Sequence, residues 1–496
     1  MSYERDIYMV DPAKRSHEDA IDRANNEING KKDNIRKSPY RLNYHFMAPT
    51  GWINDPNGFV QYNAQYHLFY QYNPYSSNWG QIHWGHAISK DLVKWEHLPV
   101  ALAPSEQYDN CGCFSGSAVV HNDTLYLFYT GFVDGEIPRQ VQCMAFSKDG
   151  FCFKKNNKNP IIGGFPAEGS YDFRDPKVWK HNDQWYMVVG TSKDGIGKIA
   201  LYSSSDLEDW RYLGIAAKSE YNQEDMWECP DLFSLQDTHA LIVSPLYGNE
   251  SGRPMCFIGD MDYENVLFTQ LECSTLDYGS DFYAPQTMMD SRGRRIMIAW
   301  MDNWSAKMPS KKYGWAGAMT IPRQLVLENK SNLKQKPIPE LVQLRSHYKK
   351  EGPLEVEGVA TINNNQEIAS EIIIIFNMNL SSASEFGIQL RASEDGKEKT
   401  EILFDITKRE VIVDREKSGC GDGGISSAPF GLNKDNIITI RMYMDTTSLE
   451  IFINDGEQVI TNRIYPEVSS RKFNIFAREG KIHINQIESW KINSIW

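Results

Sequence analysis

A short hydrophobic and aromatic segment recurs five times along this 496-residue chain, at intervals of 55 to 60 residues. Its copies begin at Tyr66, Leu125, Trp185, Ala240 and Arg295. A second motif, a serine followed two residues later by an aspartate, keeps nearly the same interval and begins at Ser89, Ser147 and Ser204. Two independent motifs that share one long period indicate a repeat architecture, in which every repeat folds as one supersecondary unit.

The repeats contain short strand signals and turn residues, with few helical patterns. A unit of this length fits a four-stranded sheet, and several such sheets arranged around an axis form a β-propeller. The alternative is an ordinary β-sandwich with incidental similarity between its strands, but such strands lack a fixed long period. We therefore predict an all-β chain with a five-bladed β-propeller over residues 41–329.

The sequence on either side of the repeats predicts further units. Residues 1–40 read as a partly helical N-terminal extension, with the helix over 12–35. A polar stretch with Lys and Pro at 330–353 is typical of a linker that contains a short helix. Alternating strands predict a β-sandwich over 354–496, and we expect it to brace the propeller rather than to bind carbohydrate independently. Its predicted strands are 370–377, 409–414, 437–444 and 449–454.

Composition excludes several classes of partner. With 52 Lys and Arg against 65 Asp and Glu, the net charge is −13, which disfavours nucleic acid or an anionic membrane surface. The sequence shows neither an apolar run of spanning length nor a secretory signal, so we expect a cytoplasmic protein that does not enter a membrane. The eight cysteines are expected as free thiols, and their spacing argues against a zinc site. No cofactor is expected. The oligomeric state stays open, a homo-oligomer included.

The repeat also locates candidate functional residues. Five short segments stand 10 to 13 residues before the recurring strands, at 54–58, 114–117, 174–176, 228–231 and 283–286. The first strand of each propeller blade lines the central channel, so these segments should converge on one axial pocket. Three of them carry a carboxylate, namely Asp55, Asp175 and Glu228. We predict these three as the catalytic residues.

Acidic side chains in an aromatic-lined pocket suit glycoside cleavage, in which one carboxyl group protonates the leaving oxygen and another attacks or stabilises the anomeric centre. Glu228, next to Trp227, is expected to have a raised pKa, whereas Asp55, in a turn rich in backbone donors, is expected to stay ionised. Each motif alone also has a structural explanation, as a turn, an ion pair or a strand cap. Spacing gives no distance, so retention and inversion both stay open here.

The motifs taken together resemble those of glycoside hydrolase family 32, the invertases and related β-fructofuranosidases. The segments that carry the resemblance are 52–58, 114–117, 173–178, 227–232, 281–287 and 298–301. The resemblance covers about residues 40–490 and is greatest to bacterial intracellular sucrose and sucrose-6-phosphate hydrolases. One departure is Ile53, where methionine is more usual, and it should alter the packing beneath Asp55 without altering its role.

The resemblance implies a retaining double displacement on a small sugar substrate, without a metal. Asp55 would attack the anomeric carbon of the fructosyl unit, and Glu228 would act as acid and then as base. Asp175 would hold sugar hydroxyls and stabilise the transition state, positioned by Arg174. Cys229 would be a neighbour in the pocket and not a nucleophile. The other positions that match the fructose pocket are Asn54, Gln71, Trp79, Phe114, Ser115 and Trp300.

Several functional alternatives remain open from the sequence. A fructosyltransferase uses the same covalent intermediate with an acceptor sugar in place of water. An exo-acting fructan hydrolase would differ in the depth and rim of its pocket. A non-catalytic sugar-binding propeller is disfavoured, since all three carboxylates are present.

Overall fold

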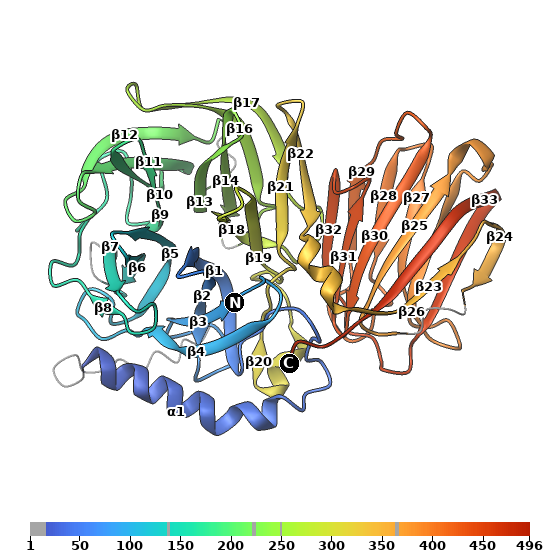
Figure 1. Cartoon of the computed structure of the whole chain (residues 1–496), viewed down its shortest axis with the longest axis horizontal. Helices are drawn as coiled ribbons and strands as arrows, with labels where there is room; N and C mark the ends of the chain where they lie inside the picture. The colour runs from blue at the N-terminus through green and yellow to red at the C-terminus, as the bar shows by residue number, and fades with distance from the viewer. Residues whose placement is uncertain (1–15, 136–138, 221–224, 249, 363–366) are drawn as a thin grey trace.

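Each recurring hydrophobic segment forms the second strand of a four-stranded antiparallel blade, and five such blades stand around a common axis (Figure 1). This second strand lies in the middle of its sheet with both faces covered, so its residues are almost continuously hydrophobic. This computed structural model describes residues 16–135, 139–220, 225–248, 250–362 and 367–496. The predicted all-β fold with a five-bladed propeller is confirmed.

The blades follow one another in sequence order. Blade one comprises β1 (Gly51–Tyr62), β2 (Gln65–Asn73), β3 (His83–Ser89) and β4 (Trp95–Leu102). Blade two comprises β5 (Gly112–His121), β6 (Thr124–Phe132), β7 (Gln140–Ser147) and β8 (Lys154–Lys155). Blade three comprises β9 (Phe173–His181), β10 (Gln184–Lys193), β11 (Ile196–Ser204) and β12 (Arg211–Lys218). Blade four comprises β13 (Met226–Leu235), β14 (Thr238–Tyr247), β16 (Met255–Asp262) and β17 (Leu267–Thr275), with β15 (Glu250–Ser251) beside β14. Blade five comprises β18 (Tyr283–Met289), β19 (Arg295–Trp300), β21 (Arg323–Glu328) and β22 (Asn332–Pro337).

The recurring Ser-x-Asp motif is the turn that follows the third strand of blades one to three. In blade one, the Asp91 carboxylate accepts hydrogen bonds from the backbone N–H groups of Val93 and Lys94, at 2.9 and 2.8 Å. Asp149 and Asp206 accept equivalent bonds in the next two blades. An aspartate that satisfies the backbone two and three residues ahead stabilises a tight turn, which explains why the motif keeps the period of the blades.

The ring closes between blades five and one. The innermost strands β1, β5, β9, β13 and β18 contact one another in turn, and β18 contacts β1. A short strand from blade five, β20 (Trp315–Ala316), pairs in parallel with β1. Gly317, at φ +83°, follows β20, and a Cβ atom there would stand 2.0 Å from the Ile53 backbone oxygen. Glycine is therefore required where the two ends of the ring meet.

One long helix, α1 (His17–Ile35), runs beneath blade one beside β4 (Figure 1). Ser16 and Asp19 form a capping box at its N-terminus, the arrangement that satisfies the first free N–H groups of a helix. The helix lies within the range expected at 12–35, of which 12–15 fall outside the described residues.

The range expected to be a linker contains regular structure. Its first part is β22, the outer strand of blade five, so the propeller continues beyond residue 329. A 3₁₀ helix, η3 (Pro339–Leu344), follows where a short helix was expected, and β23 (Arg345–Glu351) already belongs to the second domain. The polar composition of this range reflects an edge strand and a crossing between domains, not an absence of structure.

The second domain is the predicted β-sandwich, built on one long bent strand, β33 (Lys472–Ile492), which pairs with β26 in its first half and with β25 in its second. Isoleucine, valine and phenylalanine side chains from both layers meet in one core. The remaining strands are β24 (Leu354–Thr361), β25 (Ser370–Asn377), β26 (Glu385–Ala392), β27 (Thr400–Asp405), β28 (Glu410–Asp414), β29 (Ile425–Pro429), β30 (Ile437–Asp445), β31 (Ser448–Ile453) and β32 (Gln458–Arg463).

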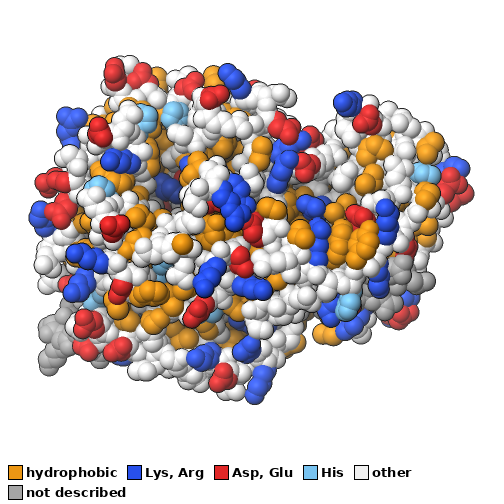
Figure 2. Space-filling model, in the orientation of Figure 1, with side chains coloured by type: hydrophobic (Ala, Val, Ile, Leu, Met, Phe, Trp, Pro, Cys, Tyr) orange, Lys and Arg blue, Asp and Glu red, His pale blue; other side chains and the backbone are white. Residues whose placement is uncertain are grey.

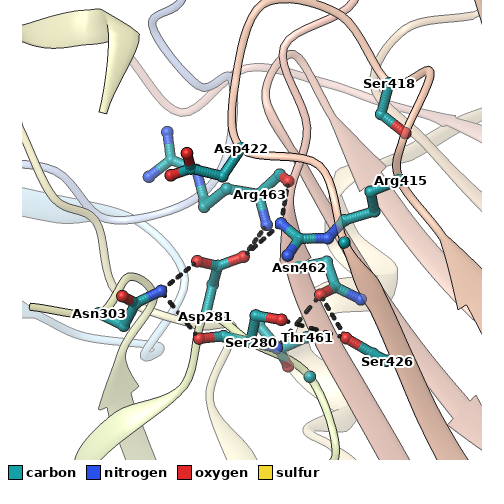
Figure 3. A network of polar contacts seen from close by, with 12 residues as sticks. Ser280, Asp281, Asn303, Arg415, Ser418, Asp422, Ser426, Thr461, Asn462 and Arg463 are labelled. Carbon is teal, nitrogen blue, oxygen red and sulfur yellow. Dashed lines mark hydrogen bonds and ion pairs between the residues drawn. The ribbon is translucent and has the colours of Figure 1, made fainter. Parts of the chain in front are cut away.

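The propeller and the sandwich are joined by buried charges. Asp281, just before blade five, accepts bonds from the Arg415 guanidinium and from the Arg463 backbone, at 2.9 and 2.7 Å (Figure 3). The Arg323 guanidinium bridges Asp277 of the propeller and Glu450 of the sandwich, at 2.9 and 2.6 Å. All of these side chains are nearly or fully buried, so the contact between the domains is part of the core.

Charged side chains of both signs are interspersed on the surface. On the face shown in Figure 2, Lys and Arg side chains lie among Asp and Glu side chains. Within the described ranges, no helix has the length and apolar character needed to cross a membrane.

Candidate active site

The inner strand of every blade carries a β-bulge at the same place. The pairing register shifts around 54–55 in β1, 115 in β5, 175–176 in β9, 229–230 in β13 and 284–285 in β18. Asp175, Cys229 and Ala284 adopt positive φ at these bulges, a conformation uncommon for residues with a side chain. A bulge bends the strand and redirects its side chains. The five segments singled out in the sequence are therefore these five bulges, at the inner edge of the ring.

Asp55 lies at the bulge of β1 and is almost completely buried. The Ser115 hydroxyl of the next blade donates to its Oδ2 at 2.6 Å, and the Asn54 amide donates to Oδ1 at 2.9 Å. The Trp52 indole N–H in turn donates to Asn54 Oδ1 at 2.8 Å. Asp55 is thus fixed by its own strand and by the neighbouring blade, with both oxygens engaged.

Cys229 connects two of the acids. Its backbone N–H donates to Asp175 Oδ2 at 2.8 Å, and its Sγ lies 3.5 Å from Asp55 Oδ2. Burial and the surrounding carboxylates raise the pKa of the Cys229 thiol well above its ordinary value. A thiol that stays protonated is a weak nucleophile and metal ligand, so Cys229 lies in the site as a spacer and hydrogen-bond donor.

Glu228 lies one residue before the bulge of β13 and is held from both sides. The Arg174 Nε–H donates to its Oε1 at 2.9 Å, and the Tyr283 hydroxyl donates to its Oε2 at 2.7 Å. Arg174 also donates to Asp172 at 2.9 Å. Arg174 and Tyr283 stand immediately before the bulges of β9 and β18, as Glu228 does in β13. Side chains from blades three, four and five therefore meet at Glu228.

The electrostatics of the site differ from the expectation based on the sequence. Burial and the nearby carboxylates of Glu228 and Asp55 together raise the pKa of Asp175 to about 7, and Arg174 opposes the shift. Burial also raises the pKa of Asp55, although the bonds from Ser115 and Asn54 favour its charged form. The sequence predicted that backbone N–H groups of a turn would keep Asp55 ionised. In the structure, its hydrogen-bond donors are side chains instead.

Aromatic side chains of two kinds surround the acids. Trp79 is 37% exposed and meets the Phe114 ring edge-on, with 6.1 Å between ring centroids, so it can offer an open face to a sugar. Trp300 is fully buried and packs edge-on against Trp52 at 5.7 Å. Of the two tryptophans expected in the sugar pocket, Trp79 is accessible to a sugar. Trp300 is not, because it is buried against Trp52.

The other expected residues also gather near the bulges. Gln71 is buried on β2, and its amide donates to the Cys113 carbonyl at 3.2 Å, immediately before Phe114 and Ser115. The eleven residues predicted for the site thus lie on the inner strands β1, β5, β9 and β13, on the second strands β2 and β19, and in the loop after β2. The region described contains no cluster of three or more His, Cys, Asp or Glu side chains suited to a metal ion.

Sequence reasoning missed Tyr283 and Trp304. Tyr283 belongs to the segment 283–286 and stands at the position equivalent to Glu228. An alignment of the five repeats could therefore have predicted that Tyr283 lies in the ring. Trp304 stacks on Trp52 with 6.1 Å between ring centroids and an interplanar angle of 22°. It lies in the loop between β19 and β20, outside the repeated pattern, and nothing in the spacing identifies it.

Three carboxyl groups lie at the inner edge of the propeller, with an arginine and an accessible tryptophan beside them. This combination is typical of the active site of a glycoside hydrolase. Comparison with known proteins agrees. Residues 45–337 match the sequence model of the glycosyl hydrolases family 32 N-terminal domain, and residues 340–491 match that of the family 32 C-terminal domain.

Individual relatives cover nearly the whole chain. A sucrose-6-phosphate hydrolase of Escherichia coli is 39% identical over 471 residues, which are 92% of this chain and 96% of that protein. Among solved structures, a family 32 β-fructofuranosidase of Bombyx mori superposes with a TM-score of 0.82 at 33% identity, over 97% of this chain and 99% of that one. A sucrose-6-phosphate hydrolase of Lactobacillus gasseri gives a TM-score of 0.85 at 27% identity, over 95% and 97% of the two chains.

The chain belongs to glycosyl hydrolase family 32. It is a fructofuranoside-cleaving glycoside hydrolase, in agreement with the expectation drawn from its motifs.

Proposed function

We propose that the enzyme hydrolyses the terminal β-D-fructofuranoside of sucrose or of sucrose 6-phosphate, with retention of configuration. The observation that carries this proposal is that two carboxyl groups have different hydrogen-bond partners. Asp55 is held by a hydroxyl and an amide in blades one and two, whereas Glu228 is held by Arg174 and Tyr283 in blades three and five. Two acids in unlike environments suit one nucleophile and one proton donor.

In the first step, Asp55 attacks the anomeric carbon of the fructosyl unit while Glu228 gives its proton to the departing glycosidic oxygen. The bond between fructose and the leaving sugar breaks as the bond to Asp55 forms. In the second step, Glu228 takes a proton from water, the water oxygen bonds to the anomeric carbon, and Asp55 is released as a carboxylate. Glu228 ends protonated, as it began.

Asp175 serves in this proposal as a binding group for fructose hydroxyls. Its pKa near 7 lets it act both as a donor and as an acceptor of hydrogen bonds at neutral pH. Arg174 ties Glu228 to blade three, and Trp79 with Phe114 forms the apolar side of the entrance. Asn54, Gln71, Ser115 and Cys229 hold or surround the nucleophile, and Trp300 supports them from behind.

The substrate assignment rests on relatives and on size. The Escherichia coli and Lactobacillus gasseri proteins are named sucrose-6-phosphate hydrolases, and a variant of the Bombyx mori enzyme was solved with sucrose. A cytoplasmic location, which we also propose, fits small imported sugars better than polymeric fructans.

A comparison of kcat/KM for sucrose, sucrose 6-phosphate and 1-kestose tests the proposal, since this ratio reports discrimination between transition states. We expect either sucrose or its phosphate to exceed 1-kestose by at least about ten-fold. NMR at early reaction times should show that fructose is first released as the β-furanose anomer. A preference for fructans would reject the substrate, an inverted anomer would reject the mechanism, and dominant oligosaccharide formation at high sucrose would indicate a fructosyltransferase.

A further inference from the structure

A cavity of about 880 Å³ lies at the outer side of blade one, away from the bulges. It is bounded by α1, by the segment that leads into β1, by strands of blade one and by residues 494–496. Tyr70 and Tyr72 of β2 line it, while Gln71 between them reaches Cys113 of blade two. Successive residues of a strand point to opposite faces, so this cavity lies on the face of blade one opposite to blade two.

The side chains that line the cavity are rich in positive charge. Lys32, Arg36 and Arg41 are basic, and Asp33 is the one acidic side chain among the lining residues. The Arg41 guanidinium donates to the Ala48 carbonyl at 2.8 Å and lies 5.0 Å from the Trp315 ring centroid. Within the described part of the chain it has no carboxylate partner, and burial lowers its pKa to about 10. A buried cation without a counter-ion is costly unless an anion joins it.

Two further hydrogen-bonding groups face the same space. The Tyr70 hydroxyl, on an almost fully buried side chain, makes no hydrogen bond to a described residue, although Tyr70 lines the cavity. His97 also lines the cavity, and its ring stacks on Trp496 with 5.3 Å between ring centroids. Burial and the nearby Arg41 lower the pKa of His97 to about 3, while a backbone hydrogen bond with Met47 opposes the shift, so the ring is neutral.

The backbone of β3 lets the Tyr70 ring pack closely at the edge of this cavity. Gly85 lines the cavity, and a Cβ atom at this position would stand 2.2 Å from the Tyr70 ring. Any larger residue would displace Tyr70. The volume lies within the range of small-molecule sites, which usually combine aromatic walls with a few convergent polar groups.

We propose that this cavity, formed by α1, blade one and the C-terminal residues, binds a phosphate monoester or free phosphate, with Arg41 and the Tyr70 hydroxyl inside and Lys32 and Arg36 at the α1 wall. Guanidinium groups suit phosphate oxygens because they present several N–H donors in a fixed plane. The aromatic rings would cover the uncharged part of a sugar phosphate. The site is separate from the catalytic carboxylates, so the inference does not depend on the proposed substrate.

The test measures binding of orthophosphate and, separately, of glucose 6-phosphate and glucose by calorimetry to the full-length protein. The double variant Lys32→Gln/Arg36→Gln removes two charges from the α1 wall. Lys37→Gln, which changes an exposed lysine next to α1 that does not line the cavity, is the matched control. Tyr70→Phe removes only the buried hydroxyl and should leave the thermal midpoint nearly unchanged.

We expect the double variant to weaken binding by about ten-fold and Tyr70→Phe by about three-fold, with Lys37→Gln unchanged. Tighter binding of glucose 6-phosphate than of orthophosphate would assign the ligand as a sugar phosphate, and equal binding would assign free phosphate. Absence of millimolar binding by either anion would overturn the proposal. So would binding that the double variant leaves unchanged, or binding of glucose as tight as that of its phosphate.

Discussion

The protein buries charged side chains in two places, and the two are built differently. At the interface between propeller and sandwich, acids meet bases: Arg323 bridges Asp277 and Glu450, and His45 lies between Glu450 and Asp445. Although burial alone would lower the pKa of His45, its bonds to the two acids raise it. At the inner bulges of the propeller, acids outnumber bases: Arg174 pairs with Glu228 and Asp172, and the pKa values of Asp55 and Asp175 are raised.

The difference separates charges that stabilise the fold, at the domain interface, from charges that are suited to a reaction, at the inner bulges. Balanced charges with backbone donors make a rigid contact between domains. Burial among other carboxyl groups raises the pKa values of Asp55 and Asp175, and acids shifted in this way are typical of catalytic sites. Substitutions at the two places should therefore change different measured quantities.

The largest effect is expected at the catalytic end. Asp55→Ala should reduce kcat by a factor on the order of 10³ or more, because no other side chain can form the covalent bond. Initial rates of sugar release from sucrose or its phosphate measure this loss. The melting temperature should not fall, since the variant relieves repulsion among the acids. Turnover within ten-fold of the unmodified enzyme would remove Asp55 from the nucleophile role, and Asp183→Asn, at an exposed turn, is the matched control.

The interface should respond in stability instead. Arg323→Met leaves Asp277 and Glu450 buried without their shared cation, and we expect a loss of about 3–5 kcal/mol in unfolding free energy. Urea unfolding followed by circular dichroism measures it. Arg478→Met removes an exposed arginine that pairs with two acids of the sandwich and should cost less than about 1 kcal/mol. Equal losses in the two variants would contradict the contrast between buried and exposed pairs.

Tyr283→Phe should lower kcat about ten-fold, because Glu228 loses the hydroxyl that donates to Oε2. KM should change less, since the tyrosine positions the acid rather than the sugar. The comparison is with Tyr348→Phe, which removes a similar bond to Glu488 in the sandwich. A change in KM alone would place Tyr283 in substrate binding.

The smallest effect is a pH dependence of stability. The folded-state pKa of Asp175, about 7, lies above its ordinary value, so its contribution is fully present below about pH 4 and lost as pH rises through 7. The Asp175→Asn variant has no carboxyl group at this position, so it does not lose stability in this way as the pH rises. The melting temperature of the variant relative to the unmodified protein should therefore rise by a few degrees between pH 4 and 8. A constant difference over this range would show that Asp175 does not take up a proton on folding.

Much of the fold could be predicted because repetition is visible in sequence. The hydrophobic second strands and the turns at Asp91 and its counterparts mark the blades without any structural knowledge. The boundary of the propeller could not be predicted, because β22 is an outer strand with polar side chains and no repeated motif.

The site was predictable as a ring of segments but not as a set of contacts. The motifs identify Asp55, Asp175 and Glu228, whereas the link through Cys229 depends on a positive φ that the sequence does not reveal. The raised pKa of Asp55 likewise follows from burial by neighbouring blades, which a local turn cannot indicate.

The five bulges form a ring in which neighbouring blades hold one another's acids. Ser115 of blade two donates to Asp55 of blade one, and the Cys229 backbone of blade four donates to Asp175 of blade three. Ala284 occupies the fifth place with a single methyl group. At the other bulges, a substitution should therefore disturb the acid of a neighbouring blade as well as the residue that it replaces.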